Sequence, residues 1–247
     1  HRSGLLLGIF DEPTATRLLE ERGVLAALRA RLGGADLRVR LHPDEGIFRI
    51  HLAAAPEGPD SVVVELKVRL ATGTADESGR RLGFPCLDFL AVDWMLLQDP
   101  LRAFPPGRRP LPGQRHPGLG LGEEVVGSIV RTAGRLGAAG VIGIPMYYHA
   151  AVLYHRLFAF IDPVEEGRFQ ALMRDLRGLP LAEAAAAVAD GRIRDASQDR
   201  VLAWEGREMV LPLADPVRAY LAAPRYADAA ARALIGTRFV VEAAPIC

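Results

Sequence analysis

The sequence predicts an α/β protein of the α+β type, with a mixed, largely antiparallel central sheet flanked by helices. Three observations support this fold class. Residues 37–70 contain runs in which apolar and polar residues alternate, separated by short polar loops, as in an antiparallel meander. The apolar period then lengthens to that of a helix over residues 121–136. Residues 138–146 form a continuous apolar run, which is typical of a strand buried on both faces.

Size and composition favour a folded protein without a strong overall charge. The chain has 247 residues, of which 50% are hydrophobic and 24% are charged, so it can bury a substantial core and is too apolar for a disordered chain. Thirty basic and 30 acidic residues give a formal net charge of +0. A neutral protein has no global field to hold nucleic acid or an anionic membrane. We therefore expect neither as a partner.

Cysteine use and the N-terminal run bear on the compartment. Cys86 and Cys247 are the two cysteines, and they show neither metal-ligand spacing nor a disulfide framework. A reduced, cytoplasmic setting is the expectation. The apolar run at residues 5–10 ends at Asp11, which makes it too short to span a bilayer.

The N-terminal half is predicted to hold a strand, two helices and a four-stranded meander. Residues 4–10 suggest a short buried strand, and Asp11 followed by Pro13 marks a helix start. Gly23 is expected to break the helical region that extends to residue 32. The four meander strands are predicted at 37–41, 46–53, 61–70 and 87–97.

The C-terminal half is predicted to be mainly helical. A loop over residues 98–114, rich in Pro and Arg, precedes the helix at 121–136. Further helices are predicted at 148–158, 163–177, 181–190 and 216–235, the last interrupted at Pro224. A hairpin is predicted at 201–213 and a last strand at 237–242. Residues 1–161 are expected to form the core domain, with 162–247 as a helical and hairpin extension packed on it.

The segment Arg115-His116-Pro117-Gly118-Leu119-Gly120 has the residue types that a phosphate site needs. The N-terminus of a helix presents unpaired N–H groups and a partial positive charge. Glycines let a phosphate approach the backbone and can adopt positive φ, and Arg115 can add a charge-assisted hydrogen bond. A plain glycine turn before a helix is the alternative interpretation.

Three segments resemble the Gcn5-related N-acetyltransferase (GNAT) superfamily. Arg115-x-x-Gly118-x-Gly120 resembles its Q/R-x-x-G-x-G/A motif, residues 141–145 look like its following strand, and residues 150–160 are similar to its A-x-x-x-Y-x-x-x-G-F helix and strand. The resemblance implies acetyl-CoA, or another acyl-CoA, as the cofactor. It assigns cofactor binding to Gln114, Arg115, Gly118, Leu119, Gly120, Leu121, Gly122 and Ile144, with the Ile144 region holding the thioester carbonyl oxygen.

The acid and base have several candidates, each with a structural alternative. Tyr154 matches the family's helix tyrosine and could donate a proton to the CoA sulfur, or be a core tyrosine. Glu65 and Asp93 lie within apolar strands, where burial raises a carboxyl pKa. They are candidate bases, or else they pair with an Arg on a neighbouring strand. His149 could orient the substrate, act as the base, or pack in the core. The histidines show no metal-ligand spacing, so no metal is expected.

These observations lead to an acyl-CoA-dependent N-acyltransferase acting on an amine of a small molecule or peptide by direct attack on the thioester. The family's Asn and Gly are replaced near His149 and at Phe158, which motivates an alternative, a catalytically inactive acyl-CoA-binding or assembly module. A third alternative is a structural protein that binds no CoA. A dinucleotide site is disfavoured, because the fingerprint needs its third glycine three residues after the second, whereas Gly122 follows Gly120 by two residues. Residues 162–247 are expected to cover the acceptor cleft or to form a homodimer contact.

Overall fold

The computed structural model describes residues 4–72, 84 and 86–242 and divides the chain into two compact units. The first unit comprises His1–Ala71, Phe89–Pro110 and Gln114–Gly137, and the second comprises Thr72–Asp88, Leu111–Gly113 and Ala138–Cys247. The predicted boundary at residues 161 and 162 therefore lies inside the second unit. The α+β class with largely antiparallel strand pairing is confirmed.

The first unit contains two helices, a meander and one further helix. In chain order these are α1 (Glu12–Glu21), α2 (Val24–Arg31), β1 (Leu37–His42), β2 (Ile47–Leu52), β3 (Val62–Thr72), β4 (Asp88–Leu97) and α4 (Gly122–Arg135), with short 3₁₀ turns at Pro43–Glu45 and Pro59–Ser61. The strands follow one another in space in the order β1-β2-β3-β4, as a meander requires. The pairs Val39–Ile50 and Ile50–Val64 show that β1–β2 and β2–β3 are antiparallel.

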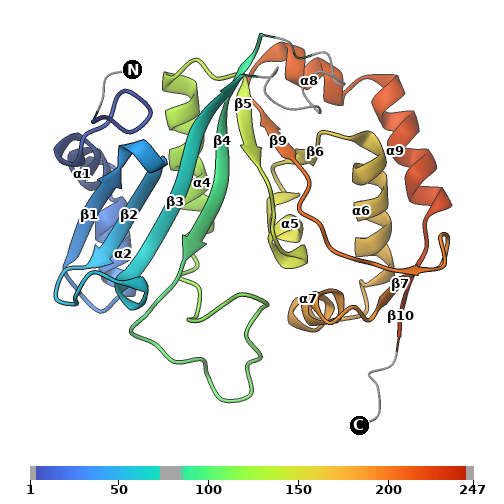
Figure 1. The fold of residues 1–247 in the computed structure, drawn as a ribbon, viewed down its shortest axis with the longest axis horizontal. Coiled ribbons are helices and arrows are strands. Elements are labelled where there is room, and N and C mark those ends of the chain that lie inside the picture. The colour runs from blue at the N-terminus through green and yellow to red at the C-terminus, as the bar shows by residue number, and fades with distance from the viewer. Residues whose placement is uncertain (1–3, 73–83, 85, 243–247) are drawn as a thin grey trace. The chain divides into compact units, whose positions relative to one another are not determined.

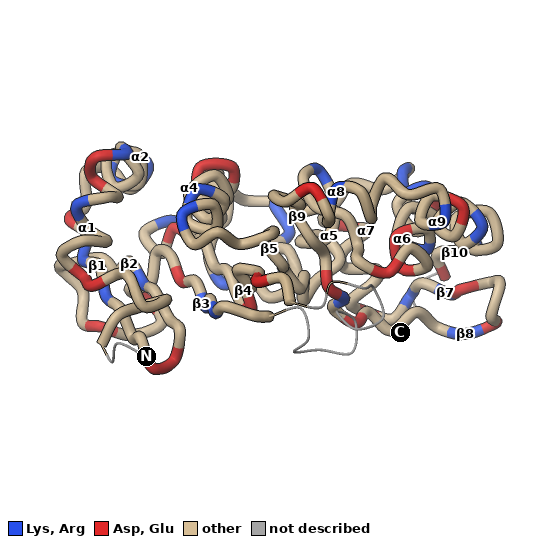
Figure 2. Tube along the Cα trace, turned by 90° about the horizontal axis from the view of Figure 1, so that it is seen from above, with Lys and Arg blue, Asp and Glu red and all other residues tan. Residues whose placement is uncertain are grey.

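Local sequence explains where the first two helices begin and end. The Asp11 side chain caps α1 by accepting a hydrogen bond from the Thr14 N–H at 2.8 Å. Gly23 adopts a left-handed conformation (φ 69°) at the start of α2, as expected for a break between the helices. Leu25 and Leu28 of α2 are fully buried against Ile50 and Val63 of the sheet. Figure 2 shows α1, α2 and α4 on the same face of the meander.

The second unit combines two small sheets with a set of helices. Its elements are β5 (Gly140–Gly143), α5 (Tyr148–Tyr154), β6 (Ala159–Phe160), α6 (Pro163–Asp175), α7 (Leu181–Ala189), β7 (Ile193–Asp195), β8 (Arg200–Val201), β9 (Met209–Pro212), α8 (Asp215–Leu221), α9 (Pro224–Gly236) and β10 (Phe239–Val241). Strand β9 lies between β5 and β6 and is antiparallel to both (Figure 1). The C-terminal segment therefore contributes a strand to the sheet of β5 and β6.

Helices α6 and α9 lie side by side in the second unit (Figure 1) and make the most extensive helix–helix contact among the described residues. Gly167 of α6 faces Ala230 of α9, and no side chain separates the two backbones. The Tyr226 hydroxyl of α9 donates to the Phe160 carbonyl oxygen at 2.6 Å, which ties α9 to β6. Small residues thus allow close approach, and one buried hydroxyl fixes the position of the helix.

Two predicted elements are wrong. Residues 4–10 form a tight turn with an isolated bridge between Leu6 and Phe10, because Gly4 and Gly8 take positive φ (99° and 74°) and fold the segment back on itself. The predicted hairpin at 201–213 is absent, because β8 pairs with β7 while β9 pairs with β5 and β6. The predicted strand at 138–146 is shorter, Gly140–Gly143.

Over the stretch that the structure describes, none of the helices has both the length and the apolar character needed to cross a membrane.

Candidate functional site

The glycine turn ends at a helix start whose backbone N–H groups receive no side-chain cap. Helix α4 begins at Gly122, and its N-cap residue, Leu121, has no capping side chain. Gly120 has φ 70°, in the region that favours glycine. A Cβ built at Gly120 or at Gly122 would meet no heavy atom of the described chain within 4 Å. The start of α4 is therefore open, as binding of a phosphate to the main chain requires.

Buried leucines and a backbone hydrogen bond hold the turn in place. Leu119 and Leu121 are each 5% exposed and belong to the core of the first unit. The Asp99 N–H, just after β4, donates to the Pro117 carbonyl oxygen at 2.8 Å. Gly118 and Gly120, which alternate with these two buried leucines, are exposed to solvent. The turn is thus a fixed feature of the first unit.

The charges around the turn are mixed. Arg115 is exposed at its start. Glu123 and Glu124 lie in the first turn of α4 and are also exposed. Acidic residues at this position stabilise a helix through its macrodipole, and they also repel an anion bound at the same end. The predicted contact residue Gln114 is partly buried next to Gly118.

Glu65 and Asp93 both lie in the first unit, and each is paired with an arginine. Glu65 Oε2 on β3 is 2.5 Å from Arg49 Nε on β2. Asp93 Oδ2 on β4 is 3.0 Å from Arg69 Nε on β3. The two carboxyl side chains are 21% and 28% exposed. These are the cross-strand pairs that the structural interpretation of both acids predicts, and neither carboxylate is available as a base without giving up its arginine.

Tyr154, His149 and Ile144 lie in the second unit. Burial raises the pKa of Tyr154 to about 12, so its phenol stays protonated at neutral pH and is a weaker acid than an exposed tyrosine. Its ring packs on Phe158, with centroids 5.6 Å apart. A Cβ built at Gly143 would lie 3.5 Å from Cε2 of Tyr154, an ordinary van der Waals distance, so the Tyr154 ring packs against the end of β5. Ile144 follows β5 directly and is partly buried.

His149 is buried, and one of its ring nitrogens has no hydrogen-bond partner among the described residues. It is 8% exposed, and burial lowers the pKa of its imidazole, which is therefore neutral near pH 7. The nitrogen in question is Nδ1. The ring stacks on Tyr147 at 5.5 Å between centroids, with an interplanar angle of 15°. A neutral imidazole with an unused nitrogen can accept a proton or bind a polar substrate group.

The sequence analysis missed a polar cavity of about 220 Å³ in the second unit. In its wall Arg168 Nη2 lies 2.7 Å from Asp195 Oδ2, and the guanidinium stands over the Phe239 ring at 5.7 Å. Trp204, also in the wall, donates from Nε1 to the Pro145 carbonyl oxygen at 3.2 Å. The only sequence signal was a tryptophan in a predicted hairpin. Because these polar groups are already satisfied, we assign them to the architecture of the unit.

Over the residues that the structure describes, no group of three or more His, Cys, Asp or Glu side chains is arranged to hold a metal ion. No model of a known protein family matches the sequence, and no curated protein matches it.

Proposed function

We propose that the protein is an acyl-CoA-dependent N-acyltransferase that transfers an acyl group, acetyl in the simplest case, to an amine of a small molecule or peptide. The observation that carries the proposal is the open start of α4. Its N–H groups lack a side-chain cap, and the glycines at 120 and 122 leave the space in front of them clear. A helix start of this kind binds a phosphate group through main-chain hydrogen bonds. Its glycine pattern is the one that resembles the GNAT motif.

In this proposal the turn of the first unit binds the diphosphate of CoA. The family resemblance, and not the arrangement of the two units, is the reason for proposing Tyr154 of the second unit as the group that protonates the departing thiolate. Burial raises the pKa of Tyr154 to about 12, which keeps the phenol protonated as this role requires but makes it a weaker acid than an ordinary tyrosine, so the role rests on the match to the family's helix tyrosine. His149, buried and neutral, is the better candidate than Glu65 or Asp93 for taking the proton of the attacking amine. Both acids are engaged by arginines. The amine attacks the thioester carbon, the carbon–sulfur bond breaks, and CoA leaves as the thiol.

The pairing of Glu65 and Asp93 also favours a second candidate function, a module on the same fold that binds acyl-CoA without turnover. The two functions share the diphosphate site and differ in the release of CoA. Incubating the protein with acetyl-CoA and a panel of amines, and measuring free thiol, separates them. Thiol release that needs an amine supports the enzyme, and a Tyr154→Phe variant should then lose roughly 10²-fold in kcat. CoA binding without release supports the module.

Calorimetry with CoA tests the site itself. Gly120→Trp should abolish CoA binding, because an indole would fill the open space before α4. Gly120→Ala is the matched control, since it imposes the same positive-φ strain (φ 70°) with one methyl group. Equal affinity in wild type and in folded Gly120→Trp would refute the placement. Absence of CoA binding in the wild type would favour a structural protein.

The two glutamates in the first turn of α4 allow a test in which CoA binding should become tighter. Glu123→Gln combined with Glu124→Gln removes two negative charges from the proposed diphosphate site and should tighten CoA binding by a few-fold at low salt. Arg115→Gln should weaken it by a similar factor. If neither variant changes the affinity for CoA, the diphosphate does not lie at the start of α4.

A further inference from the structure

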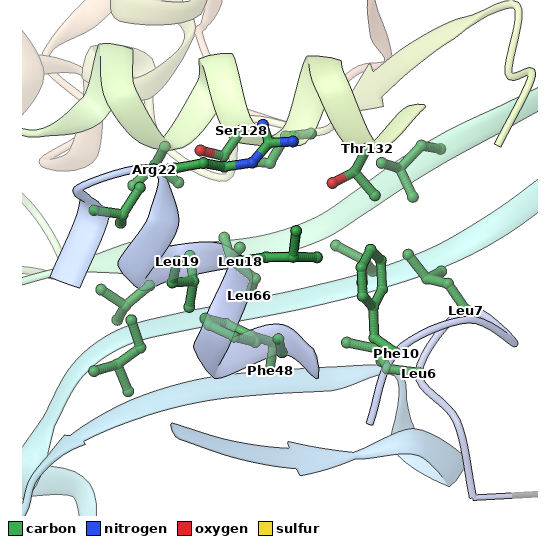
Figure 3. A pocket seen from close by; sticks show the side chains of 18 of the residues that line it. Leu6, Leu7, Phe10, Leu18, Leu19, Arg22, Phe48, Leu66, Ser128 and Thr132 are labelled. Carbon is green, nitrogen blue, oxygen red and sulfur yellow. The ribbon is translucent and has the colours of Figure 1, made fainter. Parts of the chain in front are cut away.

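The first unit contains an apolar cavity of about 140 Å³ beneath α1, α2 and α4. Its floor consists of side chains from the meander strands, among them Phe48 and Leu66, and its roof includes Leu18 and Leu19 of α1 (Figure 3). Side chains of the N-terminal turn, including Phe10, line one end. The cavity is partly open to solvent, so a small molecule can reach its apolar wall.

The size of the cavity limits what it can hold. An apolar cavity of about 150 Å³ in another protein remains dry and binds benzene. The present cavity has a similar volume and a mainly aliphatic and aromatic wall. Water would find few hydrogen-bond partners there, so the natural occupant is apolar. A body of roughly six to eight carbon atoms fits this volume.

One part of the wall carries unused positive charge. Arg22, at the end of α1, is half-buried, lines the cavity and extends toward Ser128 on α4 (Figure 3). Within the described part of the chain its guanidinium has no hydrogen-bond or ion-pair partner. Ser128 Oγ accepts a hydrogen bond from Arg131 Nη2 at 3.0 Å, and Arg135 is the second arginine that lines the cavity. A half-buried guanidinium without an acceptor favours an anionic ligand, and its planar fork matches a carboxylate.

The N-terminal turn adds an independent sign of constraint at the cavity. Leu7, whose side chain lines it, has φ 53°, which is unusual for a residue with a side chain. Hydrogen bonds between the backbones of Leu6 and Phe10, at 2.8 and 3.1 Å, hold the turn in this conformation. Strained backbone of this kind is often found where a fold positions groups around a ligand. Here it directs Leu6, Leu7 and Phe10 to one cavity.

We propose that this cavity binds a small amphipathic carboxylate. The apolar body, an alkyl chain or a phenyl ring of roughly six to eight carbons, packs on Leu18, Phe48 and Leu66, and the carboxylate accepts hydrogen bonds from Arg22. The site lies wholly within the first unit and uses none of the residues assigned to CoA. Its test is therefore independent of the acyltransferase proposal.

Calorimetric titration with octanoate and with octanamide, its uncharged analogue, tests the proposal. Wild type should bind octanoate at least roughly tenfold more tightly than octanamide, because only octanoate pairs with the arginine. Arg22→Gln should remove that preference by weakening octanoate binding alone. Arg17→Gln is the matched control. Arg17 is on the same helix, its side chain is 68% exposed, and it does not line the cavity, so octanoate affinity should be unchanged.

A second variant tests the apolar part of the site. Leu18→Trp should fill the cavity and abolish binding of both ligands, with the circular dichroism spectrum confirming that the protein is folded. If this variant does not fold, the comparison of Arg22→Gln with Arg17→Gln still decides the question. Failure of octanoate to bind wild type, equal affinity for octanoate and octanamide, or an Arg22→Gln variant that keeps the preference would each overturn the proposal.

Discussion

The contact between α6 and α9 allows one stability prediction to be worked out from geometry. Gly167 of α6 has no room for a side chain. A Cβ built there would overlap the carbonyl oxygen of Ala230 and would lie 2.8 Å from Cβ of Ala233. Carbon atoms normally approach to about 3.5–4.0 Å. Gly167→Ala must therefore separate the two helices by about 1 Å or bend one of them.

Overpacking of this kind costs about 1–3 kcal/mol, and the clash with a backbone atom places Gly167→Ala in the upper part of that range. Ala is a better helix former than Gly by up to about 1 kcal/mol, which offsets part of the loss. The expected net decrease in the free energy of unfolding is therefore about 1–2 kcal/mol. Urea unfolding followed by circular dichroism measures this difference.

Gly236→Ala is the matched control, because Gly236 ends α9 and a Cβ there would meet no heavy atom of the described chain within 4 Å. The control should be neutral or slightly stabilising. A Gly167→Ala variant as stable as wild type would show that α6 and α9 do not approach as closely as the structure has them.

Three further predictions concern ionic groups of the second unit. Asp195→Ala should lower the free energy of unfolding by about 3–5 kcal/mol in thermal or urea denaturation, because Asp195 is 1% exposed and its loss leaves the Arg168 guanidinium, whose side chain is 16% exposed, without its partner. Burial raises the pKa of Glu166, but its hydrogen bonds to His155, Phe160 and Gln170 outweigh this and lower the pKa overall. The resulting stability is complete above the unfolded value, near 4.5, and is lost as pH falls through the lower folded value. Urea titrations between about pH 6 and about pH 3 should show a steeper loss for wild type than for Glu166→Gln, and parallel curves would contradict this assignment. Asp162→Ala should cost about 1 kcal/mol in the same assay, since Asp162 caps α6 by accepting from the Val164 N–H at 2.7 Å, whereas Asp162→Asn should retain most of that stability.

Elements defined by local patterns were predicted well from the sequence. The alternation in residues 46–53 identified β2 and its buried Ile50, and the helical period after Leu121 identified α4. Gly23 was correctly placed at the break between α1 and α2. In each case the signal lies within a few residues of the chain, where backbone propensity and side-chain period decide the outcome.

Elements defined by distant partners were not predictable in the same way. The run from Leu5 to Phe10 has strand-like composition, but glycines with positive φ turn it back on itself. Val201 and Met209 were assigned to one hairpin, although Met209 pairs with Gly143 and Phe160. Strand pairing depends on which edge is available in the folded unit, and a single sequence does not encode this locally.

The candidate site shows the same division. The sequence identified the glycine turn, and the fold leaves the start of its helix open. For Glu65 the sequence left two interpretations, and only the neighbouring strand, which presents Arg49, distinguishes them. The charge at Arg22 carried no sequence signal, because the cavity it lines is assembled from α1, the meander and α4.

Helix α4 links the two proposals and makes them separable by experiment. Its N-terminus offers main-chain N–H groups at Gly122, whereas its side contributes Ser128 and Ile129 to the apolar cavity. Leu119 and Leu121, which flank Gly120, are buried in the core of the first unit. A substitution at Gly120 that only obstructs the turn should remove CoA binding and leave octanoate binding intact. If folded Gly120→Trp loses both CoA binding and octanoate binding, the turn also determines the position of α4 over the sheet. The loss of CoA binding would then result from a displaced helix and not from a blocked site.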